Sequence, residues 1–155
     1  MSLGPSFVDA WSRFLQWIDA LLNSTVSDDI DVGRAPTILE NPSVALVAHN
    51  GFRFDFPFLL CELLRHNLDV QFEQWYFIDT LVVFGAINHG CLKLQCLARD
   101  AVIDAGNAHR ALDDSIALRN VSIVMAQRLG ITSKQLLSMF LCEFDLASSC
   151  VLVCD

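Results

Sequence analysis

The chain has 155 residues, of which 54% are hydrophobic and 18% charged, and its formal net charge is −8. This length provides one domain with a sizeable core, and the composition excludes an intrinsically disordered chain. The acidic balance argues against broad, nonspecific binding to a nucleic-acid backbone, which depends on lysine and arginine. It does not exclude a nucleic-acid enzyme that grips a strand end through metal ions.

The sequence predicts an intracellular protein of the cytoplasm, the nucleus or an organelle, neither secreted nor membrane-bound. No apolar stretch approaches the roughly 18 residues of a membrane helix, and the N-terminus has no signal-peptide pattern. The six cysteines lie mostly in apolar runs, where a free thiol behaves as a small hydrophobic residue, so we expect them to be reduced. No histidine lies at zinc-finger spacing near Cys91 and Cys96, which makes a structural zinc site the weaker alternative.

The first third of the chain predicts one helix, one loop and one strand. Apolar residues recur at steps of three and four from Phe7 to Leu22, with Ser6 as the cap, which predicts an amphipathic helix. Residues 23–42 are polar and rich in turn formers, and we expect an exposed loop. The apolar run over residues 43–48 predicts a short, fully buried strand.

The remaining two thirds alternate between strand and helix patterns. The predicted elements are a helix over 55–64, a strand over 71–78, a short helix capped by Thr80, and helices over 92–102, 108–129 and 134–142. Gly130 ends the long helix. Strands that alternate with helices indicate an α/β layered fold with at least one parallel pair of strands, formed by a single domain over residues 1–155.

The first candidate site segment covers residues 49–59 and reads HNGFRFDFPFL. It follows the predicted strand, at the position where open α/β sheets bind ligands. Asp55 is its candidate site residue, although a helix-capping role alone would also explain this aspartate. We expect the four phenylalanines of the segment, Phe52, Phe54, Phe56 and Phe58, to lie in the core.

The second candidate segment covers residues 108–115 and reads AHRALDDS. On a helix, Asp114 shares an apolar stripe with Leu118 and Val121, so we expect its carboxylate to be buried. A buried carboxylate needs a cation, a donor or a proton, and a metal ion would meet this need. His109 reaches the same ligand only if it lies in or before the first turn. From the residues alone, a structural pair at the start of a helix is an equal alternative.

Together, the two segments resemble the DnaQ-like, or DEDDh, family of 3′-to-5′ exonucleases. The family motif H-N-x3-(F/Y)-D-x2-(F/L)-L fits residues 49–59, and the motif H-x4-D fits His109 and Asp114. The triplet Ile78-Asp79-Thr80 matches the I-D-T that follows the first of these motifs in the family. The resemblance covers residues 7–130, leaves a C-terminal helix and tail over 131–155 outside it, and implies an RNase H-like exonuclease fold.

The resemblance also implies a function: metal-dependent hydrolysis of phosphodiester bonds at the 3′ end of DNA or RNA. Asp55 and Asp114 would be ligands of a site for two Mg²⁺ or Mn²⁺ ions, one activating water and one stabilising the leaving oxygen. His109 would be the general base that takes the proton of the attacking water. The candidate substrate-binding residues are His49, Asn50, Arg53 and Arg110.

One family motif, the D-x-E of the opening strand, is not present in the sequence. Asp29 and Asp31 have the spacing of two acids but lie in the predicted loop, and the apolar tail ends at Asp155 with no glutamate after it. We therefore expect an exonuclease fold without its N-terminal strands, little nuclease activity from these 155 residues alone, and apolar surface covered by a second copy or a partner protein. The alternative is a catalytically inactive, truncated or degenerate module that binds nucleic acid or protein.

Overall fold

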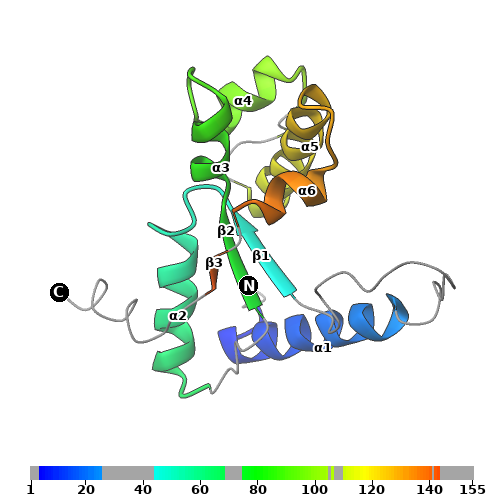
Figure 1. Ribbon diagram of the computed structural model, residues 1–155. Coiled ribbons are helices and arrows are strands. Elements are labelled where there is room, and N and C mark those ends of the chain that lie inside the picture. Colours follow the sequence, from blue (N-terminus) through cyan, green and yellow to red (C-terminus); the bar gives the residue numbers. More distant parts are fainter. Residues whose placement is uncertain are drawn as a thin grey trace, which may run out of the picture.

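The computed structural model describes residues 4–25, 44–68, 75–104, 106, 110–140 and 142–143. The predicted α/β class is confirmed, since the chain folds as a mostly helical structure around a small sheet (Figure 1). The helices are α1 (Phe7–Thr25), α2 (Asp55–Arg65), α3 (Thr80–Ile87), α4 (Leu94–Asp100), α5 (Ala111–Arg128) and α6 (Ser133–Ser138). The strands are β1 (Val44–Ala48), β2 (Trp75–Asp79) and β3 (Cys142–Glu143).

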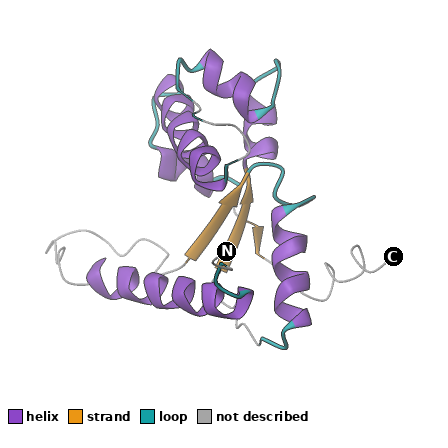
Figure 2. Cartoon of the chain, turned by 180° about the vertical axis from the view of Figure 1, so that it is seen from behind, coloured by secondary structure: helices purple, strands orange, loops and turns teal. Residues whose placement is uncertain are grey.

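The predicted parallel pair of strands is confirmed. β1 and β2 run parallel, from Val44 opposite Trp75 to Ala48 opposite Asp79. β3 lies antiparallel on the other side of β2, with Cys142 opposite Phe77. The predicted extension of the last helix to residue 142 is therefore wrong, because α6 ends at Ser138 and the chain then pairs with the sheet. Both parallel strands point toward the same group of helices (Figure 2), so the segments that follow them lie together.

The helices α3, α4, α5 and α6 form a helical lobe with its own apolar core. Side chains with at most 1% exposure come from every one of these helices: Val83, Phe84, Leu97, Ala98, Ala117, Val121, Ala126 and Leu136. Local signals define the boundaries of the last two helices. Gly130, with φ of 69°, ends α5 in the left-handed conformation that glycine adopts freely. A capping box between Thr132 and Gln135 begins α6.

The prediction that the first strand is fully buried is wrong. The residues of β1 alternate between partly buried and exposed, and none of them is buried. In the neighbouring strand, Phe77, Ile78 and Asp79 are all buried. Within the described residues, β1 pairs along one edge only, whereas β2 lies between two strands.

The first helix begins as predicted and ends later. The Ser6 hydroxyl accepts a hydrogen bond from the backbone N–H of Asp9 at 3.2 Å, which caps α1. The helix continues to Thr25, so three residues expected in a loop are helical. Residues 26–42 of that expected loop lie outside the described part of the chain. None of the described helices combines the length and the apolar character needed to cross a membrane.

The expectation of reduced cysteines is wrong for one pair. Cys91 and Cys96 form a disulfide, because the chain before α4 turns back and brings their Cα atoms to 5.9 Å, within disulfide reach. Cys61 is a free, partly buried thiol. The disulfide closes a small loop immediately before and at the start of α4.

Candidate active site

Asp79, at the end of β2, organises the edge where both parallel strands stop. Its carboxylate is 4% exposed and accepts hydrogen bonds from the backbone N–H groups of Asn50, at 2.8 Å, and Phe52, at 3.2 Å. A third bond, from the N–H of Leu81 at 2.9 Å, makes Asp79 the cap of α3 in place of the predicted Thr80. One buried carboxylate thus holds the loop after β1 against the start of α3.

His49 connects three segments of the chain. Its Nε2 donates to the carbonyl of Leu92 at 2.8 Å, and its Nδ1 lies 3.0 Å from the hydroxyl oxygen of Thr80. The hydroxyl oxygen of Thr80 also lies 3.2 Å from the carbonyl oxygen of Ala48. Both ring nitrogens of His49 therefore have partners within the protein, and its predicted contact with substrate stays a prediction.

The turn between β1 and α2 depends on two residue types. Asn50 adopts φ of 64°, a left-handed conformation that asparagine tolerates better than most residues. A Cβ atom on Gly51 would lie 2.6 Å from the ring of Phe56, so only glycine fits there. The N–H of Phe56 donates to the carbonyl of Gly51 at 2.9 Å, which fixes the start of α2.

The expectation that four phenylalanines of this segment lie in the core is wrong for three of them. Phe56 is buried at 3% exposure, whereas Phe52, Phe54 and Phe58 are 41%, 65% and 66% exposed. The buried face of α2 consists of Phe56, Leu60 and Leu63. Phe58 lies on the other side of that helix, and Phe52 and Phe54 belong to the turn before it.

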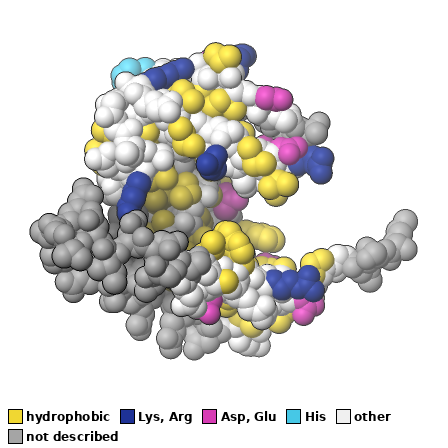
Figure 3. All heavy atoms as spheres, turned by 90° about the vertical axis from the view of Figure 1, so that its right-hand side faces the viewer, with side chains coloured by type: hydrophobic (Ala, Val, Ile, Leu, Met, Phe, Trp, Pro, Cys, Tyr) yellow, Lys and Arg dark blue, Asp and Glu magenta, His cyan; other side chains and the backbone are white. Residues whose placement is uncertain are grey.

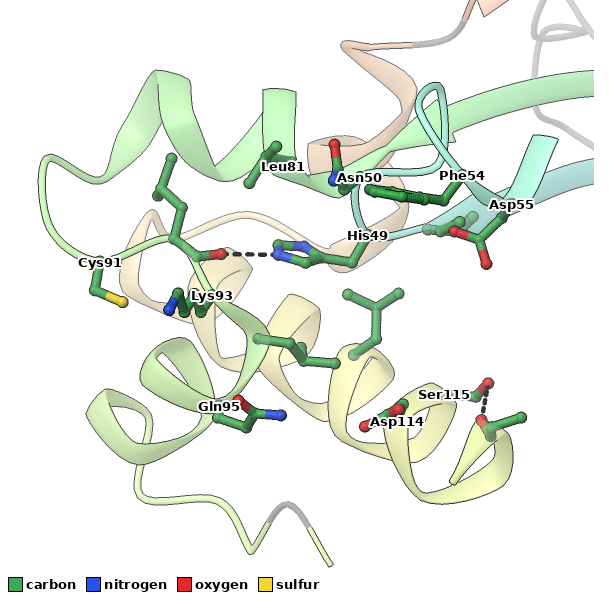
Figure 4. A pocket seen from close by; sticks show the side chains of 16 residues that line it. His49, Asn50, Phe54, Asp55, Leu81, Cys91, Lys93, Gln95, Asp114 and Ser115 are labelled. Carbon is green, nitrogen blue, oxygen red and sulfur yellow. Dashed lines mark hydrogen bonds between the residues drawn. The ribbon is translucent and has the colours of Figure 1, made fainter. Parts of the chain in front are cut away.

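The structure brings Asp55 and Asp114 to one cavity of about 1270 Å³. Figure 4 shows the two side chains on opposite walls, Asp55 at the start of α2 and Asp114 in the first turn of α5. Lys93 and Gln95, at the start of α4, complete the lining on a third side. On the face seen in Figure 3, the molecule is hollowed between its upper and lower parts, and acidic and hydrophobic side chains lie in the hollow.

Asp55 and Asp114 each lie in the first turn of a helix, and neither carboxylate is held by another described side chain. Asp55 is the first residue of α2 and is exposed, and the N-cap, Phe54, has no side-chain hydrogen bond, so the capping explanation for Asp55 is wrong. Asp114 is partly buried and not fully buried as predicted, because the first turn of α5 borders the cavity. Within the described chain, neither side chain forms an ion pair or a hydrogen bond.

Only some of the other predicted site residues line the cavity that holds the two aspartates. His49 and Asn50 line the same cavity as the two aspartates. Arg53 is exposed and lines a smaller cavity of about 480 Å³, which Asp55 also borders. Arg110 is exposed at the N-cap of α5 and borders neither of these two cavities. His109 lies outside the described residues, so its role as general base stays a prediction.

Outside the two candidate segments, sequence reasoning missed two polar residues of the cavity, Lys93 and Gln95. Neither belongs to a recognisable motif, and both fall inside a segment whose pattern predicts only a helix. The one available signal is composition, because Lys93 is one of only two lysines in the chain, the other being Lys134.

The donor chemistry of the two aspartates fits a hard divalent cation. Mg²⁺ is usually held by one or two carboxylates together with water and substrate phosphates, and two uncommitted carboxylates on facing walls meet this need. The described residues contain no group of three or more His, Cys, Asp or Glu side chains that could hold a metal ion. The role of Asp55 and Asp114 as metal ligands therefore stays a prediction that their place at one cavity is consistent with.

Comparison with known proteins gives one informative similarity. No family model matches the chain. Over 111 residues it is 32% identical to the PolC-type DNA polymerase III of Mycoplasma pneumoniae, a match that spans 65% of this chain and 8% of the polymerase. The chain is thus similar, over most of its length, to a small part of a DNA polymerase.

Proposed function

We propose that the cavity between α2, α4 and α5 is a metal-dependent site that hydrolyses phosphodiester bonds at the 3′ end of DNA or RNA, in an RNase H-like fold. The observation that carries this proposal is the pair of uncommitted carboxylates, Asp55 and Asp114, on facing walls of one cavity. The resemblance of both surrounding segments to DnaQ-like exonucleases supports it. The similarity to a DNA polymerase supports nucleic acid as the substrate.

In this mechanism the residues of the chain divide into ligands, a base and positioning residues. Asp55 and Asp114 hold Mg²⁺ or Mn²⁺ through carboxylate oxygens that form no ion pair or hydrogen bond with a described residue. A bound divalent ion supplies water activation and charge stabilisation at the phosphate. His109 accepts the proton of the attacking water. Asp79 and His49 keep the walls in place through their backbone hydrogen bonds.

An exonuclease assay tests the proposal directly. The chain is incubated with a 5′-labelled oligonucleotide and Mn²⁺, and the expected product is a ladder that shortens from the 3′ end, at a low rate because only two carboxylate ligands are identified. Asp114→Asn should lower this rate at least about 100-fold, since charge stabilisation of a transition state is typically worth that much. Asp113→Asn is the matched control, because Asp113 is the neighbouring acid on α5 and does not line the cavity. Equal rates for both variants would contradict the proposal.

A second candidate function is a non-catalytic module that binds nucleic acid or protein. It is favoured by the exposed Phe54 and Phe58 beside Asp55. Such apolar surface is typical of interaction sites, and a second copy of the chain or a partner protein could cover it. Oligonucleotide binding without any metal-dependent cleavage would favour this function over the enzymatic one.

A further inference from the structure

Lys93 brings a positive charge into a cavity whose other charged residues are acidic. It lines the cavity together with Asp55 and Asp114, and no arginine lines it. Its side chain is exposed to solvent. Figure 4 shows Lys93 and Gln95 on the α4 side of the cavity, across from the walls that carry the two aspartates.

Three interactions constrain the backbone around Lys93. The preceding carbonyl, of Leu92, accepts the hydrogen bond from His49 Nε2 at 2.8 Å. The carbonyl of Lys93 itself accepts from the N–H of Leu97, a fully buried residue of α4, at 3.0 Å. The disulfide between Cys91 and Cys96 spans Lys93. These three constraints fix the origin of the side chain relative to the cavity.

The ammonium group of Lys93 forms no capping hydrogen bond and no ion pair within the described chain. Lys93 is the N-cap residue of α4, but its side chain makes no capping hydrogen bond. It forms no ion pair with any described acid, although the chain carries eight more acidic than basic residues. The Lys93 side chain thus has no partner among the described residues, lies on a constrained backbone and lines the cavity of the two carboxylates. It is available to bind an anionic ligand.

We infer that Lys93 is a substrate-binding residue whose ammonium group contacts a backbone phosphate of the strand that enters the cavity. This inference rests on the proposed function, since it assumes that the strand end lies between Asp55 and Asp114. The contact also explains how a protein with a net charge of −8 can bind a negatively charged strand. Because the protein as a whole repels a polyanion, a cation placed within the site contributes attraction only where the strand is to be processed.

Binding of a labelled (dT)8 oligonucleotide, followed by fluorescence anisotropy with Ca²⁺ in place of Mg²⁺, tests the inference. One phosphate contact to a single strand changes the salt slope by about 0.7, which corresponds to about 5-fold in Kd at about 0.1 M salt. Lys93→Ala should show this loss of affinity and this smaller slope, and Lys93→Arg should restore both. Lys134→Ala removes the other lysine, which is exposed on α6 and does not line the cavity, and should leave the Kd unchanged.

A second arm identifies the phosphate. The last three linkages of the oligonucleotide are replaced, one at a time, by an uncharged methylphosphonate. At the contacted linkage the replacement should weaken binding to the unmodified protein but not to Lys93→Ala, because the two changes remove the same interaction. The inference would be overturned if methylphosphonate weakened binding to Lys93→Ala as much as to the unmodified protein at every linkage. It would also be overturned if Lys134→Ala lost as much affinity as Lys93→Ala. Either result would leave the proposed function standing. If the unmodified protein does not bind the oligonucleotide, both fail. Circular dichroism of each variant checks that the fold is kept.

Discussion

The two walls of the cavity that carry the aspartates differ in how firmly the rest of the protein supports them. Asp114 belongs to α5, whose next turns include the buried residues Leu118 and Val121 in the core of the helical lobe. Asp55 begins α2, which follows a partly exposed strand and a turn with exposed phenylalanines. The first wall is held by apolar packing in the helical lobe. The second combines the buried face of α2 with the hydrogen bonds of the preceding turn, which converge on Asp79.

This difference separates global stability from the geometry of the site. Damage to the core of the helical lobe should unfold the protein cooperatively, since its side chains come from four helices. Damage at Asp79 should instead loosen the turn over residues 49–55 and displace Asp55 while α5 stays folded. The variants below test this separation, from the largest expected effect to the smallest.

Phe84→Ala should cause the largest loss of stability. Phe84 is fully buried among α3, α4, α5 and α6, and removal of a buried phenylalanine side chain costs about 3–5 kcal/mol. Urea denaturation measures the change in the free energy of unfolding. A loss below about 1 kcal/mol, the size of a typical surface effect, would show that the helical lobe is not the stable part of the molecule.

Asp79→Ala should lower the free energy of unfolding by about 2–3 kcal/mol. The substitution leaves three backbone N–H groups without their charged acceptor, and a bond to a charged group contributes about 1.5–3 kcal/mol. Amide hydrogen exchange should speed up over residues 49–56 much more than over 117–126. Uniform acceleration in both segments would contradict the distinction between the two walls.

Removal of the disulfide should cost about 2 kcal/mol, the value expected for closing so short a loop. The double variant Cys91→Ser, Cys96→Ser is compared with the unmodified protein in urea, each with and without a reducing agent. Reducing agent should lower the stability of the unmodified protein to that of the variant. If it has no effect on the unmodified protein, the two cysteines are not paired in solution.

Phe58→Ser should have the smallest effect, within about 0.5 kcal/mol, because exposed positions without special contacts tolerate substitution. Phe56→Ser, two residues earlier on the buried face of α2, is the matched comparison and should be strongly destabilising. Similar losses in both variants would mean that Phe58 is covered in solution, as the predicted second copy or partner protein would require.

Patterns within a few residues predicted the helices well, because helix formation depends on local spacing and capping. The apolar repeat after Ser6 and the glycine at position 130 both mark helix ends that the structure contains. The predicted burial of β1 is wrong, since burial depends on what covers the two faces of the strand and not only on its own apolar residues.

The candidate site was predictable in part for the same physical reason. Asp55 and Asp114 were singled out because each belongs to a motif, and the fold brings both to one cavity. Lys93 and the disulfide beside it were not predicted, because both depend on a turn before α4 that has no distinctive sequence. Two of the three hydrogen bonds of Asp79 were equally inaccessible, since their donors, Asn50 and Phe52, lie 29 and 27 residues earlier in the chain.

Titration with Mn²⁺ tests most directly whether Asp55 and Asp114 are ligands of the same metal site. Asp55→Asn and Asp114→Asn should each weaken Mn²⁺ binding at least about tenfold, a loss typical even of residues that only support metal ligands. In the double variant, the loss of Mn²⁺ binding free energy should be clearly smaller than the sum of the two single losses, because both changes remove ligands of the same site. Unchanged Mn²⁺ affinity in either single variant, or fully additive losses, would contradict a shared site.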